Sequence, residues 1–196
     1  MKNVEIPRIE MDAGDFEKSL DKLVTAGKPV ILTGMNLSDV EDLWTPEYLS
    51  EKLQNRTFSI HRGENPALDF RSKNFVYDNH YPARDFITEC SEGKVRYLRS
   101  VGANFRKDRP NFWNDFSEIS GDVTKPPIER IHSSILRISP KDLEIWLHYD
   151  TLDNLLAQCK GTKEVLLFDP SDANNLYLSN DKSFCTGLIS QLERYN

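Results

Sequence analysis

The first part of the chain repeats its apolar residues with a helical period. Within residues 15–27 the apolar positions recur at i, i+4, i+7 and i+8: Phe16, Leu20, Leu23 and Val24. Asp15 suits the cap at the start of a helix, and Gly27 followed by Pro29 suits its end. The pattern predicts an amphipathic helix, followed by a short buried strand at residues 29–32.

Two more segments carry helix start signals. Residues 45–53 open with Thr45, a good capping residue, and Pro46, which fits the first turn of a helix. Pro82 stands in the same way at the start of residues 82–90. We therefore expect two further helices in the first half of the chain.

Alternation of apolar and polar residues with a period of two predicts strands. It appears first at residues 56–62, where Phe58 and Ile60 share a face. From residue 94 it predominates and predicts strands at 94–101, 130–139, 143–150, 154–159 and 163–169. A polar excursion at about 102–129 holds a short helical candidate at 110–117, and residues 168–178 predict a turn and a short helix.

Helices that precede a run of short strands indicate a mainly β fold with N-terminal helices, in the α+β class. The strand spacing favours an antiparallel sandwich or barrel. A length of 196 residues suits one domain. We expect this single domain to span 1–196, with a helical part at about 1–93 and a β core at about 94–196.

The charge is unevenly distributed along the chain. The formal net charge is -6, yet residues 94–109 hold six basic residues and one acidic residue. Two interpretations stay open for this stretch: contact with nucleic-acid phosphates, and a solvated edge strand, which is the commoner outcome. The basic residues concerned include Arg99, Arg106, Lys107 and Arg109.

The sequence carries no sign of export or of a membrane segment. The three cysteines are widely spaced and form no C-x-x-C pair, so neither a zinc site nor a disulfide framework is indicated. The first residues lack an apolar leader, and no apolar run approaches the ~20 residues that span a bilayer. We expect a soluble cytoplasmic or nuclear protein with reduced thiols.

His148 and Asp150 stand two residues apart in the most apolar stretch of the chain. On a strand such residues point to the same side, so an imidazole nitrogen and a carboxylate oxygen can reach one metal ion. Two histidines and one carboxylate form the usual open site of redox iron. The alternative is a hydrogen-bonded pair in the core, and H-x-D alone does not exclude it.

Three other polar residues fit a ligand beside such a metal. Lys163 begins an apolar strand, so it must either reach the edge or pair with an anion. Asn154 carries an amide that can bond a carboxylate, and Tyr97 offers a phenol from an earlier strand. A dicarboxylate would chelate the metal at one end and contact Lys163 and Tyr97 at the other.

The segment HYDTLDNLLAQCKGTKEVLLFDP, residues 148–170, resembles the JmjC and cupin-like family of iron(II) and 2-oxoglutarate dependent oxygenases. DFRSKNFVYDN (69–79), RYLRSVGANFRKD (96–108) and residues 133–178 resemble its branch that hydroxylates the wybutosine base of phenylalanine tRNA. The resemblance runs from about Lys28 to Tyr177.

That resemblance implies a double-stranded β-helix, the jelly roll of the cupins, and a tRNA-modifying hydroxylase. It also implies that His148 and Asp150 ligate Fe(II), and that Tyr97, Asn154 and Lys163 contact the co-substrate 2-oxoglutarate. The alternative inside the same fold is a hydroxylase of protein side chains. The sequence leaves open which of these substrates is used and whether the protein forms a homodimer.

The third iron ligand of the family, a histidine on a late strand, has no counterpart because no histidine follows His148. Three interpretations compete: a truncated oxygenase that lacks its closing strands, a catalytically silent binding module, or substitution by an upstream histidine. His132 is the candidate substitute, whereas His61 and His80 suit surface or structural positions. We favour truncation, because a pure scaffold has no obvious use for Tyr97, Asn154 and Lys163.

Aromatic residues offer a second way to contact an RNA substrate. Trp146, Trp113 and Phe112 could stack on an extruded base, as enzymes that act on bases require. In a barrel the more frequent role of such residues is packing in the core.

Overall fold

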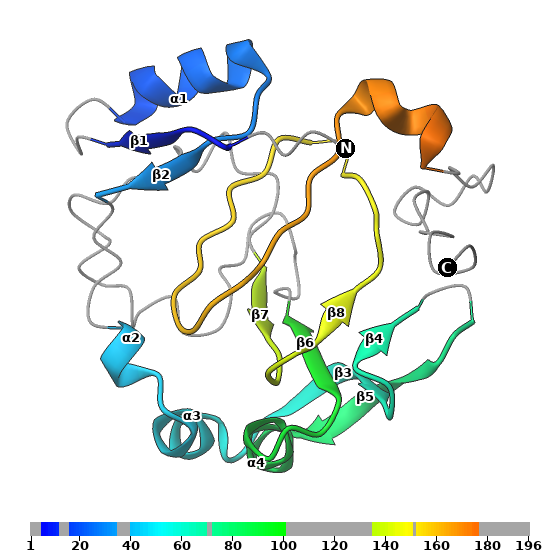
Figure 1. Ribbon diagram of the computed structural model, residues 1–196. Helices are drawn as coiled ribbons and strands as arrows, with labels where there is room; N and C mark the ends of the chain where they lie inside the picture. Colours follow the sequence, from blue (N-terminus) through cyan, green and yellow to red (C-terminus); the bar gives the residue numbers. More distant parts are fainter. Residues whose placement is uncertain are drawn as a thin grey trace. The chain divides into compact units, whose positions relative to one another are not determined.

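The computed structural model describes residues 5–11, 16–34, 40–69, 72–100, 135–150 and 152–176 (Figure 1). These residues fall into two compact units. The first unit holds the described residues up to Leu43, and the second holds those from Trp44 onward. The predictions at Arg106, Lys107, Arg109, Phe112, Trp113, the helix 110–117 and His132 lie outside the described residues.

The first unit is a strand, a helix and a strand around a small apolar core. β1 (Arg8–Glu10) and β2 (Ile31–Thr33) pair in parallel, and α1 (Phe16–Ala26) connects them. The short α2 (Val40–Leu43) follows. The buried core consists of Met11, Phe16 and Leu20, with Ile9 and Leu32 packed against it.

α1 confirms the helix predicted from the apolar spacing. It ends at Gly27, whose φ of +60° is the left-handed conformation that glycine adopts without strain. The Gly27 amide donates to the carbonyls of Leu23 and Val24, at 3.2 and 3.1 Å. The last turn is therefore closed as its sequence predicts.

The second unit contains a four-stranded antiparallel sheet. Its order is β5 (Phe75–Pro82), β3 (Thr57–Gly63), β6 (Arg96–Ser100) and β7 (Leu136–Ile138). A smaller parallel pair joins β4 (Ala67–Leu68) to β8 (Glu144–Ile145). The helices are α3 (Pro46–Leu53), α4 (Ala83–Ser91) and the 3-10 helix Pro170–Asn175. The Thr45 side chain accepts the Tyr48 amide at 3.2 Å, so the predicted cap of α3 is confirmed.

The two faces of this sheet have different roles, set by strand register. Ile60 of β3 pairs with Leu98 of β6, and both side chains are fully buried. The next pair, His61 with Tyr97, points to the opposite face because side chains alternate along a strand. α4 covers the Ile60 face, since Phe86 meets Phe58 edge to face with ring centroids 6.3 Å apart.

A β-bulge in β5 changes which side chains lie on each face. Tyr77 pairs with His61, but Tyr81 pairs with Phe58, so the register shifts between these pairs. In a regular strand Tyr81 would share the face of Tyr77, because it follows Tyr77 by four residues. The bulge shifts the alternation by one residue, so Tyr81 reaches the face that α4 covers.

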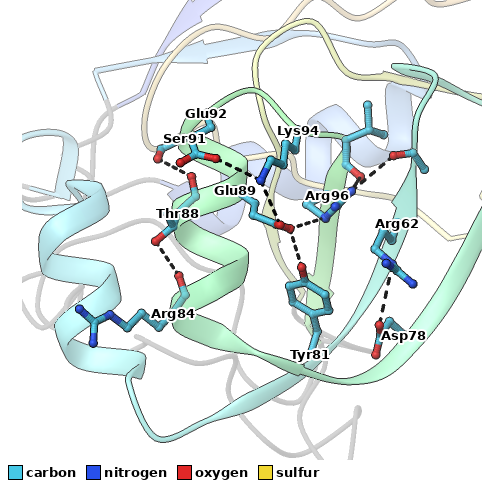
Figure 2. A network of polar contacts seen from close by, with 12 residues as sticks. Arg62, Asp78, Tyr81, Arg84, Thr88, Glu89, Ser91, Glu92, Lys94 and Arg96 are labelled. Atoms are coloured by element: carbon cyan, nitrogen blue, oxygen red, sulfur yellow. Dashed lines mark hydrogen bonds and ion pairs between the residues drawn. The ribbon is translucent and has the colours of Figure 1, made fainter.

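A polar network centred on Glu89 ties α4 to β5 and β6 (Figure 2). The Tyr81 hydroxyl donates to the carboxylate at 2.5 Å, Arg96 Nε at 2.6 Å and Lys94 Nζ at 3.2 Å. The hydrogen bond from Tyr81 lowers the pKa of Glu89 most, and those from Arg96 and Lys94 lower it further. Partial burial opposes them, and the resulting pKa of Glu89 is about 2. The Glu89 carboxylate is thus a structural anion throughout the ordinary pH range.

The strands predicted from alternation are confirmed only in part. β6 and β7 lie within the predicted segments and β3 extends one residue beyond its predicted segment, but the strand expected at 143–150 is reduced to the two residues of β8. The strands expected at 154–159 and 163–169 are wrong, since neither segment carries strand structure. Leu155, Leu156, Val165, Leu166 and Leu167 are half exposed or more, because no described strand pairs with these segments.

The fold class is confirmed at the level of helices combined with an antiparallel sheet. The described residues do not close into a barrel. The helices expected near Thr45 and Pro82 are present as α3 and α4, and residues 170–175 form the short helix expected after the turn. β5 is the longest strand that the sequence did not predict.

We predict that Glu89→Gln lowers the free energy of unfolding by about 1–3 kcal/mol, because the amide accepts charged donors less strongly. Urea denaturation at pH 7 measures this difference. The contribution of Glu89 is complete above its unfolded pKa of about 4.3 and is lost as pH falls toward its folded pKa of about 2. The gap between wild type and variant should therefore shrink between pH 5 and pH 2.

Glu92→Gln is the matched control on the same helix end. Glu92 contacts only Lys94 among the ion pairs of the described residues, at 3.2 Å, and its side chain is 54% exposed. We expect this variant to change stability by less than about 0.5 kcal/mol. Equal losses in the two variants would contradict a central role for Glu89.

Candidate functional site

The face of the sheet opposite α4 carries a row of rings across three strands. Tyr77, His61 and Tyr97 are direct cross-strand neighbours on β5, β3 and β6. The His61 ring centroid lies 4.5 Å from that of Tyr77 and 5.3 Å from that of Tyr97. Trp146, just after β8, stacks on Phe75 at 5.8 Å with an interplanar angle of 8°.

The same rings belong to a second core of the unit. Its buried members are Leu68, Phe75, Val95 and Tyr97, and Leu143, Ile145 and Trp146 pack against them. Trp146 therefore packs in the core, which is the more frequent of its two expected roles. This packing fixes the backbone that leads from β8 to His148.

His61 is the buried polar residue of the row. It is 7% exposed, and within the part of the chain that the structure describes its Nδ1 has no hydrogen-bond partner. Burial lowers the pKa of His61, which keeps the ring neutral at pH 7. His61 thus takes the structural position expected for it, and His80 is exposed as expected.

His148 is oriented by the backbone of its own segment. Its Nδ1 lies 2.9 Å from the carbonyl oxygen of Trp146. A carbonyl only accepts, so Nδ1 carries a proton in this hydrogen bond, and in the neutral ring the lone pair is then on Nε2. A backbone carbonyl on one ring nitrogen is the usual support of a metal-binding histidine.

Asp150 and Asn154 contact each other directly. Asn154 Nδ2 donates to Asp150 Oδ2 at 2.9 Å and also contacts the Leu152 carbonyl at 3.3 Å. Both side chains are exposed. The amide holds one carboxylate oxygen, which leaves Oδ1 of Asp150 for another ligand.

Tyr97 and Lys163 share one charged neighbour, Arg137 of β7. Burial raises the pKa of Tyr97, while the charges of Arg137 and Arg99 oppose this effect. Burial and the Arg137 charge both lower the pKa of Lys163. Tyr97 is 5% exposed, so its phenol is a protonated donor in a desolvated place. Arg137 is not among the predicted site residues, because its place beside Tyr97 depends on the pairing of β7 with β6.

The described residues contain no cluster of three histidine, cysteine or acidic side chains that could hold a metal. His148 and Asp150 therefore remain a pair of candidate ligands within the part of the chain that the structure covers. The strand geometry expected for this pair is absent, since residues 146–150 carry no strand assignment. Their orientation comes instead from the Trp146 carbonyl and the Asn154 amide.

Comparison with protein families gives one match that spans most of the chain. The model of the cupin-like domain matches residues 17–193. The chain belongs to the cupin-like family. The family resemblance inferred from residues 148–170 is thereby confirmed.

Curated relatives agree with this membership. The chain is 36% identical to tRNA wybutosine-synthesizing protein 5 of Mus musculus, over 91% of this chain and 61% of the relative. The identity to tRNA wybutosine-synthesizing protein 5 of Homo sapiens is 35%, over 93% and 61%. For tRNA wybutosine-synthesizing protein 4 of Neurospora crassa it is 34%, over 87% and 14%. The chain thus spans about three-fifths of the first two relatives, and its resemblance to wybutosine-synthesizing proteins is confirmed.

The described helices include none that has the length and apolar character needed to cross a membrane.

We predict that Asn154→Ala weakens binding of Mn(II), a spectroscopic substitute for Fe(II), by about tenfold, because the Asp150 carboxylate loses the amide that orients it. Electron paramagnetic resonance of free Mn(II) measures this affinity. Gln158→Ala is the control, since its amide donates to the Lys160 carbonyl at 2.7 Å and touches neither candidate ligand. Equal affinities for both variants would show that Asp150 does not depend on Asn154.

Proposed function

We propose that this chain is the cupin-like part of an Fe(II) and 2-oxoglutarate dependent hydroxylase that acts on the wybutosine base of tRNA. The observation that carries the proposal is the hydrogen bond from His148 Nδ1 to the Trp146 carbonyl, which leaves Nε2 available two residues before Asp150. The names of the relatives support tRNA as the substrate class. A tRNA substrate fits a cytoplasmic or nuclear location.

The donor set fits a redox metal with open coordination positions. A neutral imidazole and one carboxylate oxygen suit Fe(II), and they leave positions for a co-substrate and oxygen. His148 would bind through Nε2 and Asp150 through Oδ1, while Asn154 holds Oδ2. When bound, the iron would supply oxygen activation coupled to oxidative decarboxylation of 2-oxoglutarate.

The chain's own residues orient the co-substrate. The protonated Tyr97 hydroxyl and the Lys163 ammonium suit the far carboxylate of 2-oxoglutarate, as donors to an anion. Tyr97 is buried among Phe75, Val95 and Leu68, so water is excluded from that side. Both contacts would position the co-substrate without taking part in proton transfer.

We further propose that the unit follows the double-stranded β-helix of the cupins. Its sheet has one face covered by α4 and the other lined by His61, Tyr97 and Trp146, which suits one half of such a jelly roll. The third iron ligand and the closing strands stay predictions. A hydroxylase of protein side chains and a silent binding module are the alternatives that the experiments below separate.

We predict that Lys163→Ala weakens 2-oxoglutarate binding by about 2 kcal/mol, roughly 30-fold, because one charge-assisted contact is lost. Calorimetric titration in the presence of excess Mn(II) measures this change. Lys141→Ala removes the same charge from a side chain that is 89% exposed, and should leave the affinity unchanged. Parallel losses in both variants would indicate a general charge effect and contradict a Lys163 contact.

The function itself is tested by incubating the full-length hydroxylase, of which we propose this chain to be the cupin-like part, with Fe(II), 2-oxoglutarate and tRNA that carries the wybutosine precursor. We expect succinate and a hydroxylated nucleoside by mass spectrometry, and neither product from Asp150→Ala because one candidate ligand is gone. Succinate formed with a protein substrate but not with tRNA would favour the side-chain hydroxylase. Metal binding without turnover would favour the binding module.

A further inference from the structure

Two arginines face each other across the β6–β7 pair. Arg99 and Arg137 are register partners, and both side chains are exposed. Like charges placed directly opposite each other on a sheet are destabilising. Such a pair is stable only where solvent screens it or an anion binds between the two guanidinium groups.

The pair lies on the face of the candidate site. Arg99 is two residues from Tyr97 on β6, so both point away from the face that α4 covers. Arg96, on the opposite face, is neutralised by Glu89. The short strand β6 therefore carries Arg96, paired with Glu89, on the face that α4 covers. On the opposite face, which also carries Tyr97, it presents the exposed Arg99.

The ion pairs among the described residues give neither Arg99 nor Arg137 an acidic partner. Their acidic members are Asp78, Glu89, Glu92 and Asp142, which pair with Arg62, Lys94, Arg96 and Lys141. Lys163 also has no carboxylate among these pairs, and it lies within the electrostatic reach of Arg137. Arg99 and Arg137 both act electrostatically on the buried Tyr97, and the ion pairs of the described residues give neither of them a counter-ion.

A dicarboxylate co-substrate leaves part of this charge unmatched. One of its carboxylates would chelate the metal and the other would meet Lys163 and Tyr97. Two exposed guanidinium groups then remain, and their planar donors match phosphate oxygens in a bidentate fashion. Because both are exposed to solvent, they suit a large polyanion better than an enclosed small ligand.

We propose that Arg99 and Arg137 form a phosphate-binding subsite that holds a backbone phosphate of the RNA substrate beside the co-substrate pocket. This inference rests on the proposed function and adds a contact to it. The subsite sets the position of the RNA on the site face, because phosphate contacts fix register and orientation without reading sequence.

The test is tRNA binding by fluorescence anisotropy at several salt concentrations. Arg99→Gln with Arg137→Gln should weaken binding about tenfold or more, and should lower the slope of log K against log salt by about one to two. The 2-oxoglutarate affinity should stay unchanged. Arg137→Lys should restore part of the binding, because it keeps the charge but loses the planar fork.

Arg84→Gln is the matched control, since Arg84 is an exposed arginine on α4, the helix that covers the opposite face. It should leave both the affinity and the salt slope unchanged. Circular dichroism of each variant confirms that the fold is kept.

Three results would overturn the subsite: an unchanged salt slope in the double variant, a loss of 2-oxoglutarate affinity in place of tRNA affinity, or preference of the wild-type chain for acidic peptides over tRNA. The turnover assay judges the proposed function separately. tRNA binding that depends on Arg99 and Arg137 in a chain without turnover would support the subsite and reject the hydroxylase.

Discussion

The pairing register between β3 and β6 is the constraint on which the second unit depends. It places Ile60 with Leu98 on one face and His61 with Tyr97 on the other. A shift by one residue would exchange the two faces and expose the apolar pair. The register therefore separates an inner face, which α4 covers, from the site face, which carries His61 and Tyr97. Both cores of the unit form around this separation.

The same separation divides the charges of the sheet. On the inner face the Arg96 guanidinium meets Glu89 and the carbonyls of Gly63 and Val95, so its charge is used in folding. On the site face Arg99 is left open, three residues further along the same strand. Burial keeps the neighbouring Tyr97 protonated, because its anion would lose hydration there. One strand thus carries an arginine paired with Glu89 on one face and an exposed arginine on the other.

The sequence predicted what is local and missed what depends on distant partners. The helix periods and the caps at Gly27 and Thr45 were sufficient for α1 and α3. His148, Asp150, Asn154 and Lys163 lie within sixteen residues of one another, so a motif could identify them as a group. Three features could not be predicted, because each depends on which strand lies alongside. They are strand β5, the place of Arg137 opposite Arg99, and the lack of strand pairing at residues 154–159 among the described strands. The burial of His61, whose Nδ1 has no hydrogen-bond partner among the described residues, likewise follows only from the register of β3 with its neighbours.

Because of the bulge in β5, the number of residues between Tyr77 and Tyr81 matters separately from which residues they are. Asn79 and His80 are exposed and together oppose Ser59, so neither side chain is needed for packing. Loss of one of them would remove the bulge and place Tyr81 three residues after Tyr77, where regular alternation still directs it to the face of Glu89. Loss of both would place Tyr81 two residues after Tyr77 and so on the face of Tyr77, away from Glu89. Among relatives, a gap of one residue in an alignment at this point is compatible with the same α4 interface, whereas a gap of two residues would mark a rebuilt one.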